Sequence, residues 1–153
     1  MRHLWSVICS SSAIDIESNH LSIFNIFDRI IVDVTKADFP EGKSGGLPMN
    51  YHLVSKWALE PAEISYQGTQ KVELISPQGS TLVSGTGTID LTHNKRFSGR
   101  FFFNGLPIQG TGEYQFRISH RPDDSDEWIE VDTVPLTVIV NVIDDPAEHE
   151  IEE

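Results

Sequence analysis

The segment Tyr114-Gln-Phe-Arg-Ile-Ser119 decides the fold class, because its apolar side chains alternate strictly with polar ones. The same alternation runs through Leu136-Thr-Val-Ile-Val-Asn-Val142. A period of two residues directs one set of side chains into a core and the other set towards water, as in a strand of a two-layer sheet. No stretch of the chain has a convincing apolar stripe at helical spacing. The sequence therefore predicts an all-β protein.

Nine strand candidates lie between Gly, Pro and polar turns at the spacing of a β-sandwich. They are 3–11, 21–34, 49–60, 69–75, 81–91, 96–103, 112–119, 127–131 and 134–143. We predict a two-layer antiparallel β-sandwich, with immunoglobulin-like and jelly-roll-like topologies both open. The Gly- and Pro-rich segment 36–48 is expected to be a long loop, and Asn104-Gly105 a turn.

The candidate strand 21–34 is apolar on both faces and long for a single strand. A bend or bulge near residues 25–29 would let the chain switch from one sheet to the other. The alternative source of two apolar faces is a buried dimer contact.

The 153 residues carry a net charge of −12 and fit one domain, 1–143, followed by an acidic tail, 144–153, that we expect to be disordered. An acidic protein repels phosphate backbones and anionic lipids, so neither nucleic acid nor membrane is expected as a partner. Cys9 is the only cysteine and excludes an intrachain disulfide; we expect it to be buried. The longest apolar-rich run, 134–143, is far too short for a membrane helix. A cytoplasmic protein is the expectation.

Residues with catalytic or metal-binding chemistry are scattered. The six histidines have no metal-ligand spacing, and Ser10, Ser11 and Ser12 lack the frame of a catalytic serine. The acidic loop 123–127 is the best calcium candidate, but four carboxylates in a solvated turn are its more usual meaning. We therefore predict no enzyme, no metal site and no cofactor.

One set of polar residues alternates with inward apolar ones and includes several bases. Its members are His52, Lys56, Lys71, Glu73, Arg100, Gln115 and Arg117. If these residues share a sheet, they form a polar, locally basic face on an acidic protein, although a plain solvated face is the commoner outcome. His52, Lys56, Arg100 and Arg117 are the predicted binding residues.

Three segments carry a family resemblance. They are Ser6-Val-Ile-Cys-Ser-Ser-Ser-Ala-Ile-Asp-Ile-Glu-Ser-Asn-His-Leu-Ser-Ile-Phe-Asn-Ile-Phe-Asp-Arg-Ile30, Val72-Glu-Leu-Ile-Ser-Pro-Gln-Gly79 and Gly112-Glu-Tyr-Gln-Phe-Arg-Ile118. Together they resemble an uncharacterised family of small bacterial β-sandwich proteins, over most of residues 3–142. The resemblance implies a cytoplasmic bacterial β-sandwich of unknown function and transfers no catalytic or binding residue.

The function predicted from these patterns is a non-enzymatic interaction module that binds a protein partner or self-associates. The alternative is a β-sandwich that binds a carbohydrate or another polar small molecule. Trp5, Trp57, Trp128 and Tyr66 would be its stacking platforms, although Trp5 and Trp57 are expected in the core. An enzyme that uses the carboxylates of 123–127 ranks last.

Overall fold

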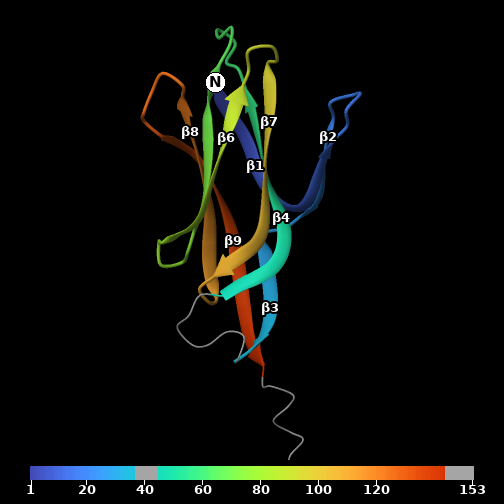
Figure 1. Ribbon diagram of the computed structural model, residues 1–153, viewed down its shortest axis with the longest axis vertical. Helices are drawn as coiled ribbons and strands as arrows, with labels where there is room; N and C mark the ends of the chain where they lie inside the picture. The colour runs from blue at the N-terminus through green and yellow to red at the C-terminus, as the bar shows by residue number, and fades with distance from the viewer. Residues whose placement is uncertain (37–44, 144–153) are drawn as a thin grey trace, which may run out of the picture.

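The computed structural model describes residues 1–36 and 45–143. The predicted acidic tail and most of the predicted loop 36–48 lie outside these ranges. The described residues form nine strands in two sheets that pack face to face (Figure 1). They contain no helix, and so none that is long and apolar enough to cross a membrane. The predicted all-β, two-layer sandwich of about nine strands is confirmed.

Sheet A has four strands in the order β2-β1-β4-β7, and sheet B has five in the order β3-β9-β8-β5-β6. The strands of sheet A are β1 (Arg2–Ile14), β2 (Leu21–Ile26), β4 (Gly45–Ala58) and β7 (Arg96–Ile108). Those of sheet B are β3 (Arg29–Thr35), β5 (Gln67–Ile75), β6 (Thr81–Asp90), β8 (Gly112–Pro122) and β9 (Ile129–Ile143).

The apolar segment 21–34 switches sheets, which confirms the predicted bend. β2 ends at Ile26 in sheet A, and β3 begins at Arg29 in sheet B. Asn25 just before the switch has a φ of 52°, in the left-handed region that Asn tolerates. The carbonyl of Asp28 accepts a 2.8 Å hydrogen bond from the amide of Thr137, which starts the pairing of β3 with β9.

Some predicted boundaries are wrong. The predicted loop 36–48 extends too far, because β4 begins at Gly45. Most of segment 127–131 and all of segment 134–143 form the single strand β9 (Ile129–Ile143), because the polar residues between them pair with β8 instead of turning. The Asn104-Gly105 pair does not end a hairpin, since β7 continues to Ile108. Gly105 takes a φ of 92° opposite a register shift in β4, so the expected turn is a β-bulge within paired strands.

The strand order follows an immunoglobulin-like sandwich. The neighbours β1-β4-β7 and β5-β8-β9 correspond to the A-B-E and C-F-G neighbours of that topology. One pair departs from the predicted antiparallel arrangement, because β3 runs parallel to β9. Tyr114, near the start of β8, donates a 2.8 Å hydrogen bond to the carbonyl of Gly110 and accepts one from the amide of Gln109. A tyrosine in this place holds the corner between two strands of immunoglobulin-like domains.

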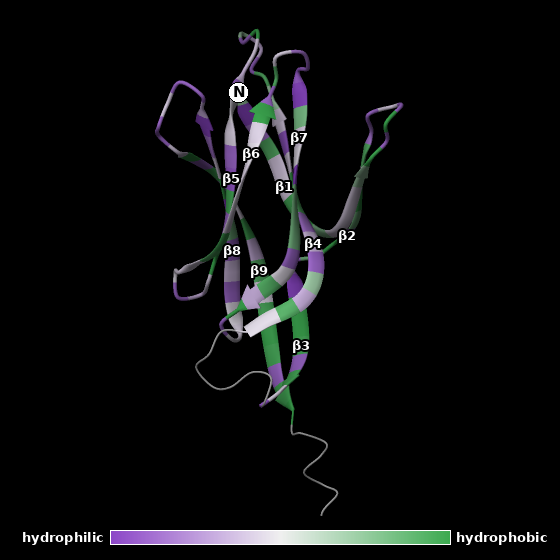
Figure 2. Ribbon diagram, in the orientation of Figure 1, coloured by the Kyte–Doolittle hydropathy of each residue, from purple (hydrophilic) through white to green (hydrophobic). Residues whose placement is uncertain are grey.

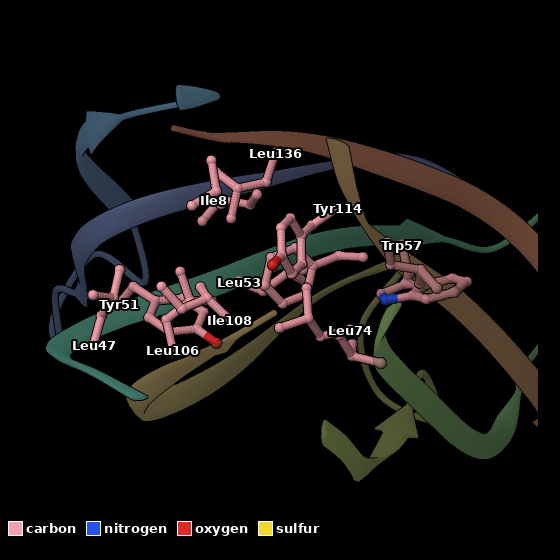
Figure 3. Packing of buried hydrophobic residues seen from close by; sticks show 14 of the residues in the cluster. Ile8, Leu47, Tyr51, Leu53, Trp57, Leu74, Leu106, Ile108, Tyr114 and Leu136 are labelled. Atoms are coloured by element: carbon pink, nitrogen blue, oxygen red, sulfur yellow. The ribbon is translucent and has the colours of Figure 1, made fainter. Parts of the chain in front are cut away.

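The core lies between the two sheets and is built by alternate residues of the long strands (Figures 2 and 3). Tyr51, Leu53 and Trp57 of β4 point inwards and are almost fully buried. Cys9 is buried as predicted, but it pairs with the outward His52 and is not part of the core between the sheets. Trp5 is not in the core as expected, since 37% of its surface is exposed. A β-bulge between His3 and Trp5 shifts the register, so that Trp5 pairs with Lys56 and not with an inward residue.

A buried polar cluster ties the two sheets together at one end of the core. The side-chain oxygen of Gln70 in β5 accepts hydrogen bonds from Ser55 Oγ at 2.8 Å and from Trp57 Nε1 at 3.0 Å, both in β4. Gln70 lies directly over Gly99 of β7, where a Cβ atom would be 2.1 Å from its side-chain nitrogen. Buried amides and hydroxyls need such partners, so the cluster favours one alignment of the sheets.

Candidate functional site

The charges of the protein are distributed unequally between the sheets. The strands of sheet A contain no Asp or Glu at all, although the chain has 23 acidic residues. Their charged residues are Arg2, Lys56, Arg96 and Arg100. The strands of sheet B hold six acidic and four basic residues. Sheet A is therefore a cationic layer on a strongly acidic protein.

The outer face of sheet A, which is turned away from sheet B, is partly apolar. Ile26, Cys9, His52 and Phe102 are successive partners across all four strands. Partners in antiparallel strands project to the same side, so they form one row on this face. The two ends of the row are open to solvent, with Ile26 63% and Phe102 62% exposed. Single exposed apolar residues are ordinary, but here two lie in one row with bases beside them.

A hairpin leaves sheet A and stands beside its outer face. β1 pairs with β4 only as far as Cys9, and beyond that point it pairs with β2 alone. We call residues 10–26 the arm. Figure 1 shows it rising away from β4 and β7, with the turn between β1 and β2 at its tip. The arm is thus joined to β4 only at its base, and beyond that point its two strands pair only with each other.

Two hydrogen bonds connect the arm to the face. The Ser12 hydroxyl and Nδ1 of His52 are 2.9 Å apart, and Arg100 donates from Nη1 to the Ser12 carbonyl at 3.4 Å. His52 packs edge-on against Phe102 with ring centroids 4.5 Å apart, and the Arg100 guanidinium lies over the same ring at 5.3 Å. Partial burial, and then the charge of Arg100, lower the pKa of His52 and so favour its neutral ring.

A polar hollow of about 210 Å³ lies between the tip of the arm and the basic end of sheet A. We call it the arm hollow. Its lining residues are Ile14, Asn19, Lys56, Asp90, Asn94, Arg96, Phe97 and Ser98. Lys56 donates from Nζ to Ser98 Oγ at 2.7 Å. Burial, and then repulsion from Arg96, lower the pKa of Lys56. Two cations therefore face one small polar space.

Among the residues that the structure describes, serine and histidine side chains meet at two places, and neither has the geometry of a catalytic triad. In the core, Ser6 Oγ is 2.7 Å and Asp132 Oδ2 3.7 Å from the same nitrogen of His3, Nε2. A triad needs the carboxylate and the serine on opposite ring nitrogens. On the outer face, the Ser12–His52 pair belongs to a sheet whose strands hold no carboxylate to orient the ring.

The predicted binding residues are divided between opposite sides of the molecule. His52, Lys56 and Arg100 come together on the outer face of sheet A, as their alternation predicted. Arg117 does not join them, because β8 belongs to sheet B. Its guanidinium is 3.2 Å from Glu73 Oε2, and Lys71 is 3.4 Å from the same oxygen. These two bases of sheet B thus share one carboxylate.

The other predicted sites have less support from the geometry. Among residues 1–36 and 45–143, no three His, Cys, Asp or Glu side chains lie close enough together to hold a metal ion. Trp57 is buried and has no free ring face for a sugar. Trp128 has Lys71 Nζ 4.5 Å from its ring centroid and the Arg121 guanidinium 4.9 Å away, so two cations already lie against its ring.

Sequence reasoning missed the arm hollow. Asn19, Asn94 and Arg96 lie in turns or at a strand start, where alternation with apolar residues gives no indication of a shared face. One feature of the sequence does point there, which is the lack of any acidic residue in segments 2–14, 21–26, 45–58 and 96–108.

Comparison with known proteins adds no assignment. No protein family model matches the chain, and no curated protein matches it. The resemblance to a bacterial family of β-sandwich proteins stays a prediction.

Proposed function

We propose that this protein is a non-enzymatic interaction module whose outer face on sheet A binds an acidic segment of another protein. The observation that carries the proposal is the charge of that sheet, four bases and no acid in a chain of net charge −12. Opposite charge attracts an acidic partner and repels basic ones. The free thiol of the buried Cys9 fits a reducing compartment, and a cytoplasmic location belongs to the same proposal.

The apolar row supplies the contact that charge alone does not. Full burial of an exposed Ile or Phe is worth about 1.5–3 kcal/mol. Ile26 and Phe102 are each more than half exposed, so covering both contributes about 2–3 kcal/mol. Association itself costs about 4 kcal/mol or more in lost freedom of movement. The face therefore fits a weak, reversible contact in which charge steers the encounter and sets the choice of partner.

The test is a titration of the isotope-labelled full chain with a synthetic peptide in which glutamate alternates with leucine. We expect amide shifts in β1, β2, β4 and β7, and an affinity that falls as salt is added. A peptide with lysine in place of glutamate is the control for charge. Phe102→Ser should weaken binding several-fold, whereas Arg117→Gln on sheet B should leave it unchanged.

Three outcomes contradict the proposal. The first is equal binding of the lysine peptide, and the second is a set of shifts confined to sheet B. The third is a concentration-dependent dimer of the protein, measured by light scattering, that Phe102→Ser converts to a monomer. That result would assign the face to a second copy of the chain instead of an acidic partner.

A further inference from the structure

The arm hollow has the features of a site for a specific group, which the open face of sheet A lacks. It has walls from two directions, since Ile14 and Asn19 belong to the arm while Lys56, Arg96 and Ser98 belong to β4 and β7. At about 210 Å³ it is smaller than the pockets that take drug-sized ligands. Its size fits a single side-chain group.

We propose that the arm hollow binds one carboxylate of the acidic partner between Lys56 and Arg96. This inference rests on the proposed function and adds the atoms that recognise the acidic group. It makes the basic end of sheet A the specific part of the interface, and the apolar row around Phe102 the less selective part.

Within the part of the chain that the structure describes, the two cations lack a counter-ion. Among residues 1–36 and 45–143, no carboxylate lies within 4 Å of the charged nitrogens of Lys56 or Arg96, whereas three bases of sheet B do have one. Holding like charges together costs free energy that an anion between them would offset. The repulsion is visible in Lys56, whose pKa is lowered by burial and then by Arg96.

The hollow also contains neutral donors. Ser98 Oγ accepts a hydrogen bond from Lys56, which leaves its own proton free to be donated. Asn19 and Asn94 also line the hollow, and each carries a side-chain amide with two N–H donors. A carboxylate has two oxygens that accept several hydrogen bonds, so this set of donors matches it.

Asp90 explains why the ligand is a carboxylate and not a phosphate. This residue lines the hollow, but its Oδ1 is engaged by the amide and the hydroxyl of Thr92, at 2.9 and 2.6 Å. Among residues 1–36 and 45–143, Asp90 forms no ion pair with Lys56 or Arg96, yet its charge remains nearby. Two positive charges and one negative charge leave a net charge of +1. That balance fits a singly charged carboxylate better than a phosphate, which carries close to two charges at pH 7.

The first experiment tests the hollow without any peptide. Sodium acetate added to the labelled full chain, at constant ionic strength against sodium chloride, should shift the side-chain amides of Asn19 and Asn94 and the backbone amide of Ser98. Lys56→Gln should abolish these shifts, and Arg117→Gln should retain them. Inorganic phosphate should act more weakly than acetate. No acetate shift in the wild type, or an equal shift in Lys56→Gln, would overturn the inference.

The second experiment separates this inference from the proposed function. Binding of the alternating glutamate peptide is compared with binding of the same peptide carrying glutamine. We expect a preference for glutamate of about tenfold in the wild type, which Lys56→Gln and Arg96→Gln each remove while glutamine-peptide affinity stays unchanged. If the variants keep the full preference for the glutamate peptide, the outer face of sheet A remains the proposed binding surface, and the arm hollow is excluded as the carboxylate site. If neither peptide binds the wild type, the proposed function fails, and the acetate titration alone decides the hollow.

Discussion

The contact between Gln70 and Gly99 leads to a quantitative prediction about the core. A Cβ atom at position 99 would lie 2.1, 2.6 and 2.7 Å from Nε2, Oε1 and Cδ of Gln70, distances that no packed side chain accommodates. Gln70 cannot move aside freely, because Ser55 and Trp57 both donate to its Oε1. We therefore expect Gly99→Ala to destabilise the fold.

The magnitude follows from two costs. Overpacking of a dense core costs about 1–3 kcal/mol. Rotation of Gln70 also breaks buried hydrogen bonds, at about 1 kcal/mol each. Gly99→Ala should thus lower the free energy of unfolding by about 2–4 kcal/mol. The backbone at Gly99 is not left-handed, so alanine brings no conformational strain of its own.

The decisive variant is the same substitution made in a Gln70→Ala background. With the amide removed, the new Cβ has space, and the stiffer unfolded chain makes Gly99→Ala neutral or stabilising by about 0.4–1 kcal/mol. The coupling free energy between the two positions is then about 3 kcal/mol. Trp57 Nε1 keeps Ser55 Oγ at 3.0 Å as a partner, so the Gln70→Ala protein retains part of the cluster.

The assay is urea unfolding of the four proteins of this cycle, followed by tryptophan fluorescence. The control is Gly46→Ala, where nothing lies within 4 Å of the added Cβ. An equal cost of Gly99→Ala in both backgrounds would refute the reasoning, because it would place the damage in the backbone and not in the contact with Gln70.

Three further predictions concern stability. Burial is the main cause that lowers the pKa of His3 and of His120 in the folded protein. As the pH falls, the unfolded chain therefore binds protons at these histidines before the folded protein does. The free energy of unfolding should decrease from about pH 7.5 to about pH 5.5, by at most ~1.4 kcal/mol per pH unit for each histidine. His120→Gln should flatten this dependence in urea midpoints, and an unchanged slope would exclude His120 as a source. Gly68→Ala should lower the free energy of unfolding by about 1–3 kcal/mol, because the added Cβ would be 2.5 Å from the Arg121 carbonyl oxygen and the Tyr66 hydroxyl. A thermal midpoint equal to that of the wild type would contradict this prediction. Tyr114→Phe should cost about 1–2 kcal/mol by releasing the turn before β8, seen as faster amide exchange there; unchanged exchange rates would show that the hydroxyl does not hold the turn.

The fold class was predictable because alternation is a local property of each strand. The sheet switch after Ile26 was predictable too, since a run that is apolar on both faces needs cover on both sides. The single strand β9 was not, because Asp132 and Thr133 resemble a turn and pair with β8 only through a register shift between Ile118 and Ser119. Register shifts of this kind depend on the partner strand, so the sequence of the strand itself does not predict them.

The candidate site was predictable in part for the same reason. Alternation correctly placed His52, Lys56 and Arg100 on one outward face. It grouped Arg117 with them because alternation shows which way a side chain points but not which sheet its strand joins. The arm was missed because its departure after Cys9 depends on where pairing with β4 stops. That point is decided by residues more than 40 positions away in the sequence.

The parallel pairing of β3 with β9 has a consequence for folding during synthesis on the ribosome. Arg29 pairs with Thr137, which is 108 positions later in the chain. β3 thus waits for almost the whole domain to be synthesised before its own partner exists, and its exposed side carries Ile31. A nascent chain in this state presents an apolar strand with no neighbour, the kind of exposed surface that makes chaperones necessary. Sheet A, whose last strand ends at Ile108, can assemble earlier. During synthesis, sheet A is therefore expected to form first, and the sandwich is expected to be completed in one late step when β9 becomes available.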